Sequence, residues 1–131
     1  LMWQDYRWIA MLDPAELSIG TEVSEVRDDI HYGRPAWRAL VRPVEGYEPR
    51  CGCCSLLPCE AVDRDEWGAD PEWRPRPAYP SGYRVALDVA TGVLVSIEPV
   101  DATDEDHHDV LDLEIHDVDI AFDDVFGALR N

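Results

Sequence analysis

The sequence predicts an α+β fold in which one or two short helices pack on one face of a curved antiparallel β-sheet. Residues 83–98 alternate apolar and polar side chains on both sides of a tight turn, which is the pattern of a β-hairpin. Residues 21–42 contain two more strand candidates, and residues 110–116 alternate as a further strand. The chain of 131 residues is long enough for one core, so we expect residues 1–131 to form a single domain.

Two short stretches near the start of the chain favour helix. Residues 2–11 carry large apolar side chains at helical spacing, although a strand remains an alternative for so short a run. Aromatic residues of this run, Trp8 among them, are expected in the core or on a covering helix, with a ligand platform as the alternative. In the second stretch, Asp13 is expected to cap a helix that has Pro14 at its first position and ends at Gly20.

The next two strands are expected over residues 21–27 and 35–42. Residues 28–33 are interpreted as the loop between them. His31 lies in this loop, where a solvated histidine is more usual than a functional one. Alternation with a period of two then divides each strand between a core face and a solvent face.

The hairpin of residues 83–98 has the clearest pattern in the chain. Asp88 is expected to accept hydrogen bonds from backbone amides of the turn, and Gly92 supplies the positive φ that a short turn needs. Pro99 is expected to end the second strand because it has no amide hydrogen to donate. Across all the expected strands, the predicted core residues are Trp37, Val41, Val85, Leu87, Val95, Leu113 and Ile115.

The remaining segments show no strand pattern. Residues 60–82 are rich in proline and charge, and their length predicts a functional or mobile Pro-rich loop. Trp67 and Trp73 are expected to pin this loop to the body of the domain. Residues 101–109 are interpreted as an acidic loop and residues 123–129 as a final helical turn.

The charge of the chain narrows the classes of partner. Acidic residues number 28 against 11 basic ones, every basic residue is arginine, and the formal net charge is −17. Such a charge repels phosphate groups and argues against nucleic-acid and anionic-membrane partners. Two roles remain open for this charge: it keeps the protein soluble, or it attracts a basic protein or cations. No apolar run reaches the ~18 residues of a membrane helix, and no targeting segment opens the chain. Because the chain starts at Leu1, we expect a partial chain.

The cysteines form the most unusual cluster of the sequence, and three states are open for it. Four thiolates suit zinc or copper(I), although a second, distant pair of ligands of the usual zinc-site type is missing. Disulfides would staple the loop, and reduced thiols without a role are the third state. Metal-bound or reduced thiols indicate the cytoplasm, whereas disulfides indicate an extracytoplasmic compartment. The candidate metal ligands are Cys51, Cys53, Cys54 and Cys59.

Catalytic motifs are missing from the sequence. It contains no G-x-S-x-G, no H-E-x-x-H and no glycine-rich phosphate loop. Carboxylates are so abundant that no pair is preferred as an acid and a base. The acidic loop at residues 101–109 lacks the glycine and the terminal glutamate of an EF-hand, so a solvated turn is a simpler interpretation than a cation site. We therefore expect a protein that is not an enzyme.

Two sets of segments resemble known families. The run Leu-Asp-Val-Ala-Thr-Gly-Val-Leu, followed by Leu-Glu-Ile-His-Asp-Val-Asp-Ile and Asp-Asp-Val-Phe, resembles the C-terminal half of LolA/RseB-like proteins. This resemblance implies a half-barrel-like sheet closed by helices around an apolar cavity, although this chain is shorter and that family has no cysteine cluster. Residues 6–17 and 49–54 are similar to uncharacterised actinobacterial proteins, which bring no known activity; arginine in place of lysine fits their GC-rich genomes.

Three functions are open at this point. The leading hypothesis is a non-enzymatic binding domain that holds an apolar small molecule or a partner protein segment between sheet and helix, with Trp8, Trp37 and Tyr83 as ligand-binding residues. The second is a cysteine-centred zinc or redox module, with His31 or His108 as reserve ligands. The third is an acidic structural or regulatory domain whose charge steers a basic protein.

Overall fold

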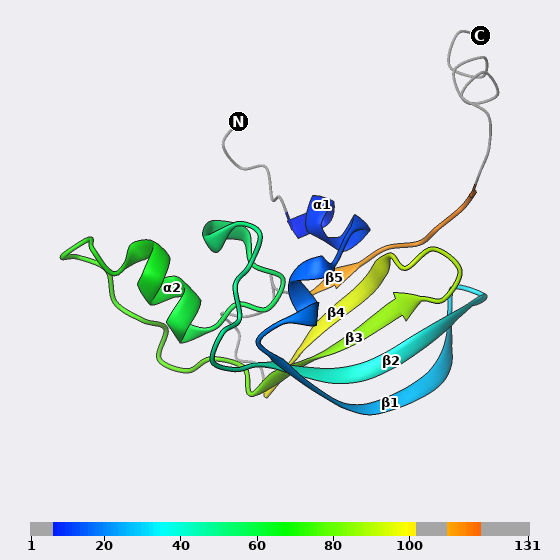
Figure 1. The fold of residues 1–131 in the computed structure, drawn as a ribbon, viewed down its shortest axis with the longest axis horizontal. Coiled ribbons are helices and arrows are strands. Elements are labelled where there is room, and N and C mark those ends of the chain that lie inside the picture. Colours follow the sequence, from blue (N-terminus) through cyan, green and yellow to red (C-terminus); the bar gives the residue numbers. More distant parts are fainter. Residues whose placement is uncertain (1–6, 102–109, 119–131) are drawn as a thin grey trace, which may run out of the picture.

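The protein folds around one curved, unclosed antiparallel sheet, which is seen in a computed structural model that describes residues 7–101 and 110–118 (Figure 1). The strands follow one another across the sheet in the order β1-β2-β3-β4-β5, so every neighbouring pair is also consecutive in sequence. Their bounds are β1 (Thr21–His31), β2 (Arg34–Pro43), β3 (Gly82–Asp88), β4 (Leu94–Val100) and β5 (Leu111–Asp112). The predicted α+β fold with a curved antiparallel sheet is confirmed.

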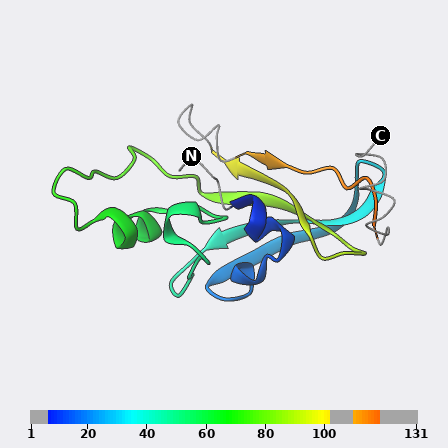
Figure 2. The same cartoon turned by 90° about the horizontal axis from the view of Figure 1, so that it is seen from above.

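Short helices lie on one face of this sheet and beside it. Two α-helices are described, α1 (Arg7–Leu12) and α2 (Glu60–Trp67), together with two 3₁₀ turns, η1 (Ala15–Ser18) and η2 (Gly52–Cys54). In both views α1 and η1 lie over the sheet, whereas α2 lies beside its end (Figures 1 and 2). The prediction that Asp13 caps a helix is wrong, because η1 begins after Pro14 and has no side-chain cap. None of the helices in the described residues is long and apolar enough to span a membrane.

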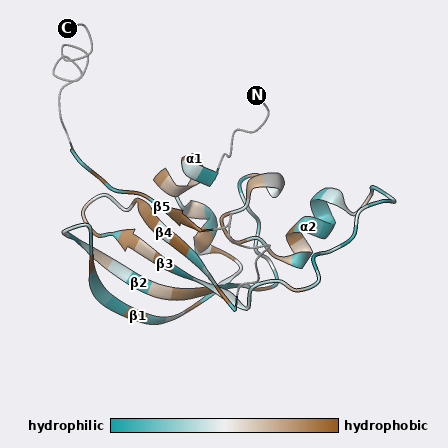
Figure 3. Ribbon diagram, turned by 180° about the vertical axis from the view of Figure 1, so that it is seen from behind, coloured by the Kyte–Doolittle hydropathy of each residue, from teal (hydrophilic) through white to brown (hydrophobic). Residues whose placement is uncertain are grey.

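The core lies between the sheet and the covering segments. Hydrophobic residues lie along β4 and β5, while α2 is mainly hydrophilic (Figure 3). The predicted core positions Val41, Val85 and Val95 are buried, and Leu87 and Leu113 pack against this core at partial exposure. The central buried side chains from sheet, helices and loops are Met11, Tyr47, Leu56, Leu57, Val62, Tyr83, Leu94, Ile97 and Leu111.

The prediction that Trp37 belongs to the core is wrong, because its side chain is 48% exposed. The strand register aligns Trp37 of β2 with Leu87 of β3 and Leu94 of β4. Exposure falls along this row to 0% at Leu94, which lies on β4, the strand that α1 contacts most. The alternation placed Trp37 on the correct face, but the helical cover ends before it.

The β1–β2 hairpin is longer and tighter than the sequence predicted. Its turn consists of Tyr32 and Gly33, with φ values of 46° and 79°, as a two-residue type I′ turn requires. The expected loop over residues 28–33 is therefore wrong for residues 28–31, which are paired in β1. His31 consequently ends a strand rather than standing in a loop.

The β3–β4 hairpin confirms the predicted turn and corrects its end. Asp88 accepts hydrogen bonds from the backbone amide and the hydroxyl of Thr91, and Gly92 has a φ of 73°. Pro99 does not end β4, which continues to Val100. The carbonyl of Val100 accepts a hydrogen bond from Ser81, so the proline nitrogen one residue earlier points to the opposite edge and removes no bond to β3.

Residues 60–82 are not a loop throughout, since α2 occupies residues 60–67. Trp67 is 47% exposed and does not pin this segment to the body. The guanidinium of Arg64 lies 5.4 Å from the centre of the Trp73 ring, but Arg64 belongs to α2, so this contact lies within the segment and does not tie it to the body. The helix was missed because its sequence is mostly charged, with only two apolar residues in its first turns.

The last strand is short. In the described residues, Leu111 and Asp112 pair with β4 and the amide of Leu113 donates to the carbonyl of Val95, whereas a strand was expected over residues 110–116. The acidic loop and the final helical turn, expected at 101–109 and 123–129, lie outside the described residues except for Asp101.

Candidate functional site

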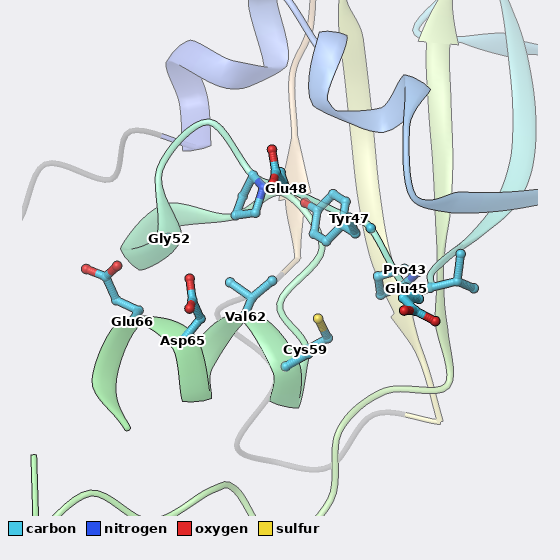
Figure 4. Close-up of a pocket in the computed structure, with 13 residues that line it drawn as sticks. Pro43, Glu45, Tyr47, Glu48, Gly52, Cys59, Val62, Asp65 and Glu66 are labelled. Atoms are coloured by element: carbon cyan, nitrogen blue, oxygen red, sulfur yellow. The ribbon is translucent and has the colours of Figure 1, made fainter. Parts of the chain in front are cut away.

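A cleft lies between α2 and the segment that follows β2, and we call it the α2 cleft (Figure 4). It has a volume of about 810 Å³, which is within the range of pockets that hold a ligand or a short peptide. Its apolar lining consists of Pro43, Val44, Tyr47, Pro49, Ala61 and Val62. Its acidic lining consists of Glu45, Glu48, Asp65 and Glu66, and Gly46, Gly52 and Cys59 complete it.

One wall of the α2 cleft is held by a close backbone contact. Gly20, with a φ of 72°, lies so near residues 46–47 that an added Cβ would stand 2.0 Å from the amide nitrogen of Tyr47. The carbonyl of Gly20 also accepts a hydrogen bond of 2.8 Å from Val44. Only glycine fits both this backbone conformation and this space. Gly20 therefore allows the chain before β1 to pack closely against residues 46–47 in the wall of the cleft.

Glu16 ties the same wall to η1. Its carboxylate accepts hydrogen bonds from the Tyr47 hydroxyl at 2.5 Å and from the amides of Leu56 and Arg50 at 3.1 Å and 3.2 Å. Burial and this bond to Glu16 raise the pKa of Tyr47 well above its ordinary value, so its hydroxyl remains a donor. The amide of Leu57 donates to the same hydroxyl oxygen. The network leaves this wall little freedom to move.

The opposite wall is α2, which projects Val62 and Asp65 toward the segment of Tyr47 (Figure 4). The other side of the helix is anchored to the chain that follows it. Asp63 accepts a hydrogen bond of 2.8 Å from the hydroxyl of Tyr79. Burial and that bond raise the pKa of Tyr79 to about 12. The helix is thus supported from behind, and its cleft side is open to a ligand.

The carboxylates of the cleft stand without partners. No hydrogen bond or ion pair joins the side chains of Glu45, Glu48, Asp65 or Glu66 to any other described residue. No arginine lines the cleft, although arginines lie beside several other acidic side chains in the described residues, among them Asp88, Asp29 and Asp13. These carboxylates are therefore negative charges that a cationic ligand entering the cleft can meet.

The cysteines that were predicted as metal ligands lie beside the cleft. Cys51 precedes η2 and Cys54 is its last residue, and both are half-buried. Cys59 precedes α2 and lines the cleft. Cys59 is a free thiol, and burial raises its pKa, which favours the protonated form. No three histidine, cysteine or acidic side chains converge on a metal position in the described residues. The side chain of Cys53 is outside that description, so a four-cysteine zinc site stays a prediction.

The predicted ligand-binding residues are not brought together. Trp8 lies on α1 with 41% of its side chain exposed, and Trp37 lies on β2 beyond the helical cover. Tyr83 is fully buried, and its hydroxyl donates a 2.5 Å hydrogen bond to the carbonyl of Pro58. This bond ties the segment before α2 to the sheet, so Tyr83 positions one end of the cleft from inside the core.

His31 has a structural position that the sequence did not suggest. Its Nε2 lies 2.9 Å from a carboxylate oxygen of Asp112 and 3.1 Å from the carbonyl oxygen of Leu113. Tyr32 donates to the other oxygen of Asp112, and this bond raises the pKa of Tyr32. Because β1 and β5 are the two edges of the sheet, these contacts bridge the open sheet at one corner. The other predicted reserve ligand, His108, lies outside the described residues.

Sequence reasoning missed the acidic residues of the α2 cleft. Carboxylates occur throughout the chain, and nothing in the spacing of these four separates them from the others. One signal was present, since no arginine occurs in residues 43–49 beside two glutamates. Comparison with known proteins adds no further residue, because no family model, no curated protein and no solved structure matches this chain. The likenesses to LolA/RseB-like and actinobacterial proteins therefore stay predictions.

Proposed function

We propose that this protein is a non-enzymatic binding domain that holds a basic segment of a partner protein in the α2 cleft. The observation that carries this proposal is the set of four carboxylates without partners in a hollow that arginines do not line. A segment with arginine or lysine side chains supplies the missing positive charges. The proposal combines two hypotheses from the sequence: a domain that binds a segment of a partner protein, and an acidic domain whose charge attracts a basic protein.

The lining of the cleft distinguishes a basic segment from other cationic ligands. A single divalent ion needs several oxygen ligands converging at one point, and no such group occurs in the described part of the chain. Separated carboxylates match separated charges along a peptide instead. Tyr47, Val62 and Pro49 add apolar surface between them, which suits the stems and neighbours of basic side chains.

An uncharged apolar ligand fits the α2 cleft less well. Its entry would remove water from carboxylates without offering a partner, which is costly for charged groups. The place where the sequence predicted an apolar cavity, between sheet and helix, is occupied by side chains that are 0% exposed, including Met11, Leu56 and Leu94. The net charge of −17 adds long-range attraction, which speeds the approach of a basic partner.

The proposal is tested by calorimetric titration with a short synthetic arginine-rich peptide, using an uncharged peptide of equal length as the reference. We expect the triple variant Glu48→Gln, Asp65→Asn, Glu66→Gln to weaken binding about tenfold or more, since each lost pair contributes ~0.5–1 kcal/mol. A matched variant, Asp28→Asn, Glu72→Gln, Glu114→Gln, also removes three charges but outside the cleft, and it should bind almost as the unchanged protein does. Equal losses in the two variants would reduce the effect to net charge and contradict the proposal.

A further inference from the structure

The arginines of the sheet all lie on one face. Side chains alternate along each strand, and the register places these arginines on the face opposite the hydrophobic core. We call it the arginine face, and its arginines are Arg27, Arg34, Arg38, Arg42 and Arg84. In an acidic protein, this face is where positive charge gathers.

Four of the five arginines face an acidic side chain. Two make ion pairs: Arg34 lies 2.8 Å from Asp88, and Arg38 contacts Asp29. The other two stand directly across from a glutamate in the strand register. The matched pairs are Arg34 with Asp88, Arg38 with Asp29, Arg42 with Glu22, and Arg84 with Glu98. These pairs explain why the face is stable with so many charges.

Arg27 is the exception, because the register places it directly across from Arg38. It makes no hydrogen bond or ion pair with the described residues, although its charge acts on Asp29, the carboxylate that Arg38 contacts. Like charges directly opposite each other in a sheet are destabilising, and Arg38 already uses its contact with Asp29. An irregularity in β1 between Ser24 and Arg27, where Glu25 has a φ of 54°, lies immediately before this position.

A hollow of about 420 Å³ opens at this place on the arginine face. Arg27, Arg38 and Arg84 reach it from three neighbouring strands, so their guanidinium groups are held by rigid elements. Glu25 and Glu98 stand at the same hollow, and the nearest oxygen of Glu25 is 4.0 Å from Arg84, which is a loose pair. Three positive and two negative groups line this hollow, and Asp29 contacts Arg38 from outside the lining, whereas no arginine lines the α2 cleft.

We propose that this hollow binds a small organic oxyanion, a phosphate or a carboxylate, that also carries hydroxyl or amino groups. The oxyanion lies between Arg27 and Arg38, where two planar guanidinium groups offer paired donors and their mutual repulsion is relieved. The hydroxyl or amino groups of the ligand donate to Glu25 and Glu98. The site is separate from the α2 cleft, so it stands or fails independently of the proposed function.

The test uses the whole chain labelled with ¹⁵N and titrated with inorganic phosphate or acetate, with sodium chloride as the reference at equal ionic strength. We expect shifts of amide and arginine side-chain signals confined to the strands around Arg27, with binding in the range of about 1 mM. Arg27→Gln should weaken this binding about tenfold. Arg42→Gln, on the same face but outside the hollow, should leave it unchanged.

A stability measurement separates binding from a structural role. If Arg27 is retained for a ligand, Arg27→Gln relieves the repulsion of Arg38 and leaves the midpoint of urea unfolding unchanged or higher, while phosphate no longer raises it. A response to phosphate alone or to acetate alone supports the site and tells which oxyanion it prefers. No confined shift with either anion, or equal shifts in Arg27→Gln, would overturn the proposal, as would a lower urea midpoint for this variant without phosphate.

Discussion

Acidic side chains on the arginine face and acidic side chains in the α2 cleft differ in what stands beside them. On the sheet, Asp88 and Asp29 contact arginines, and Glu22 and Glu98 face arginines across a strand. In the cleft, four carboxylates lie between a helix and a loop with no arginine among the lining residues. The same residue type therefore stabilises the fold in one region and leaves charge open to a ligand in the other. In so acidic a protein, the unpaired carboxylates of the cleft are the ones that we propose to bind a partner.

The comparison predicts its largest effect at Asp88, the most buried carboxylate of the arginine face. We expect Asp88→Asn to lower the free energy of unfolding by about 3 kcal/mol, because Arg34 of β2 loses its charged partner on β3. Urea unfolding followed by tryptophan fluorescence measures this. Glu48→Gln in the cleft is the matched control and should cost nothing. If both substitutions cost the same, the distinction between paired and unpaired carboxylates fails.

The same ion pair predicts how stability depends on pH. Hydrogen bonds from Arg34 hold the pKa of Asp88 well below its ordinary value. The carboxylate of Asp88 therefore takes up a proton less readily in the folded protein than in the unfolded chain. Its contribution is fully present above about pH 4 and is lost as the pH falls below that value. The difference in urea midpoint between the unchanged protein and Asp88→Asn should therefore shrink from pH 6 to about pH 2. A constant difference over this range would contradict the assignment.

The cleft predicts an effect of opposite sign and smaller size. The triple variant Glu48→Gln, Asp65→Asn, Glu66→Gln should raise the free energy of unfolding by about 0.5–1 kcal/mol at low salt, because it removes repulsion between carboxylates. This gain should disappear in about 1 M salt, where charges are screened within a few ångströms. The variant that is stabilised is also the one expected to lose peptide binding. A loss of stability instead would show that these carboxylates serve the fold.

The parts of the fold that could be predicted are those that depend on residues close together in the sequence. The β3–β4 hairpin follows from alternation around Asp88 and Gly92, and it was predicted with its turn. The extent of the helical cover could not be predicted, since it depends on the packing of α1 against β4, while Trp37 on β2 is left half exposed. The alternation of side chains along a strand predicts which face of the sheet a residue lies on. It does not predict which other element packs against that face.

The candidate sites could not be predicted because both depend on relations between distant segments. The opposition of Arg27 and Arg38 requires the β1–β2 register, which shifts between Ser24 and Arg27. The α2 cleft requires a mainly charged helix to lie near residues 43–52, and the sequence had predicted a Pro-rich loop where that helix is. Among 28 acidic residues, pairing is visible only once the chain is folded.

The finest test of the comparison is Gly52→Ala at the rim of the α2 cleft. A Cβ at residue 52 would stand 2.5 Å from a carboxylate oxygen of Glu66, which is the end of a flexible side chain and can move away. Because Gly52 has no positive φ, we expect the free energy of unfolding to change by less than about 0.5 kcal/mol. The displaced carboxylate should weaken binding of the arginine-rich peptide about twofold to threefold by calorimetry. In a Glu66→Gln background the same substitution should have no effect on binding, because no charge remains to be moved. An equal loss in both backgrounds would mean that Gly52→Ala blocks the cleft by its bulk, and Glu66 would then have no part in holding the partner.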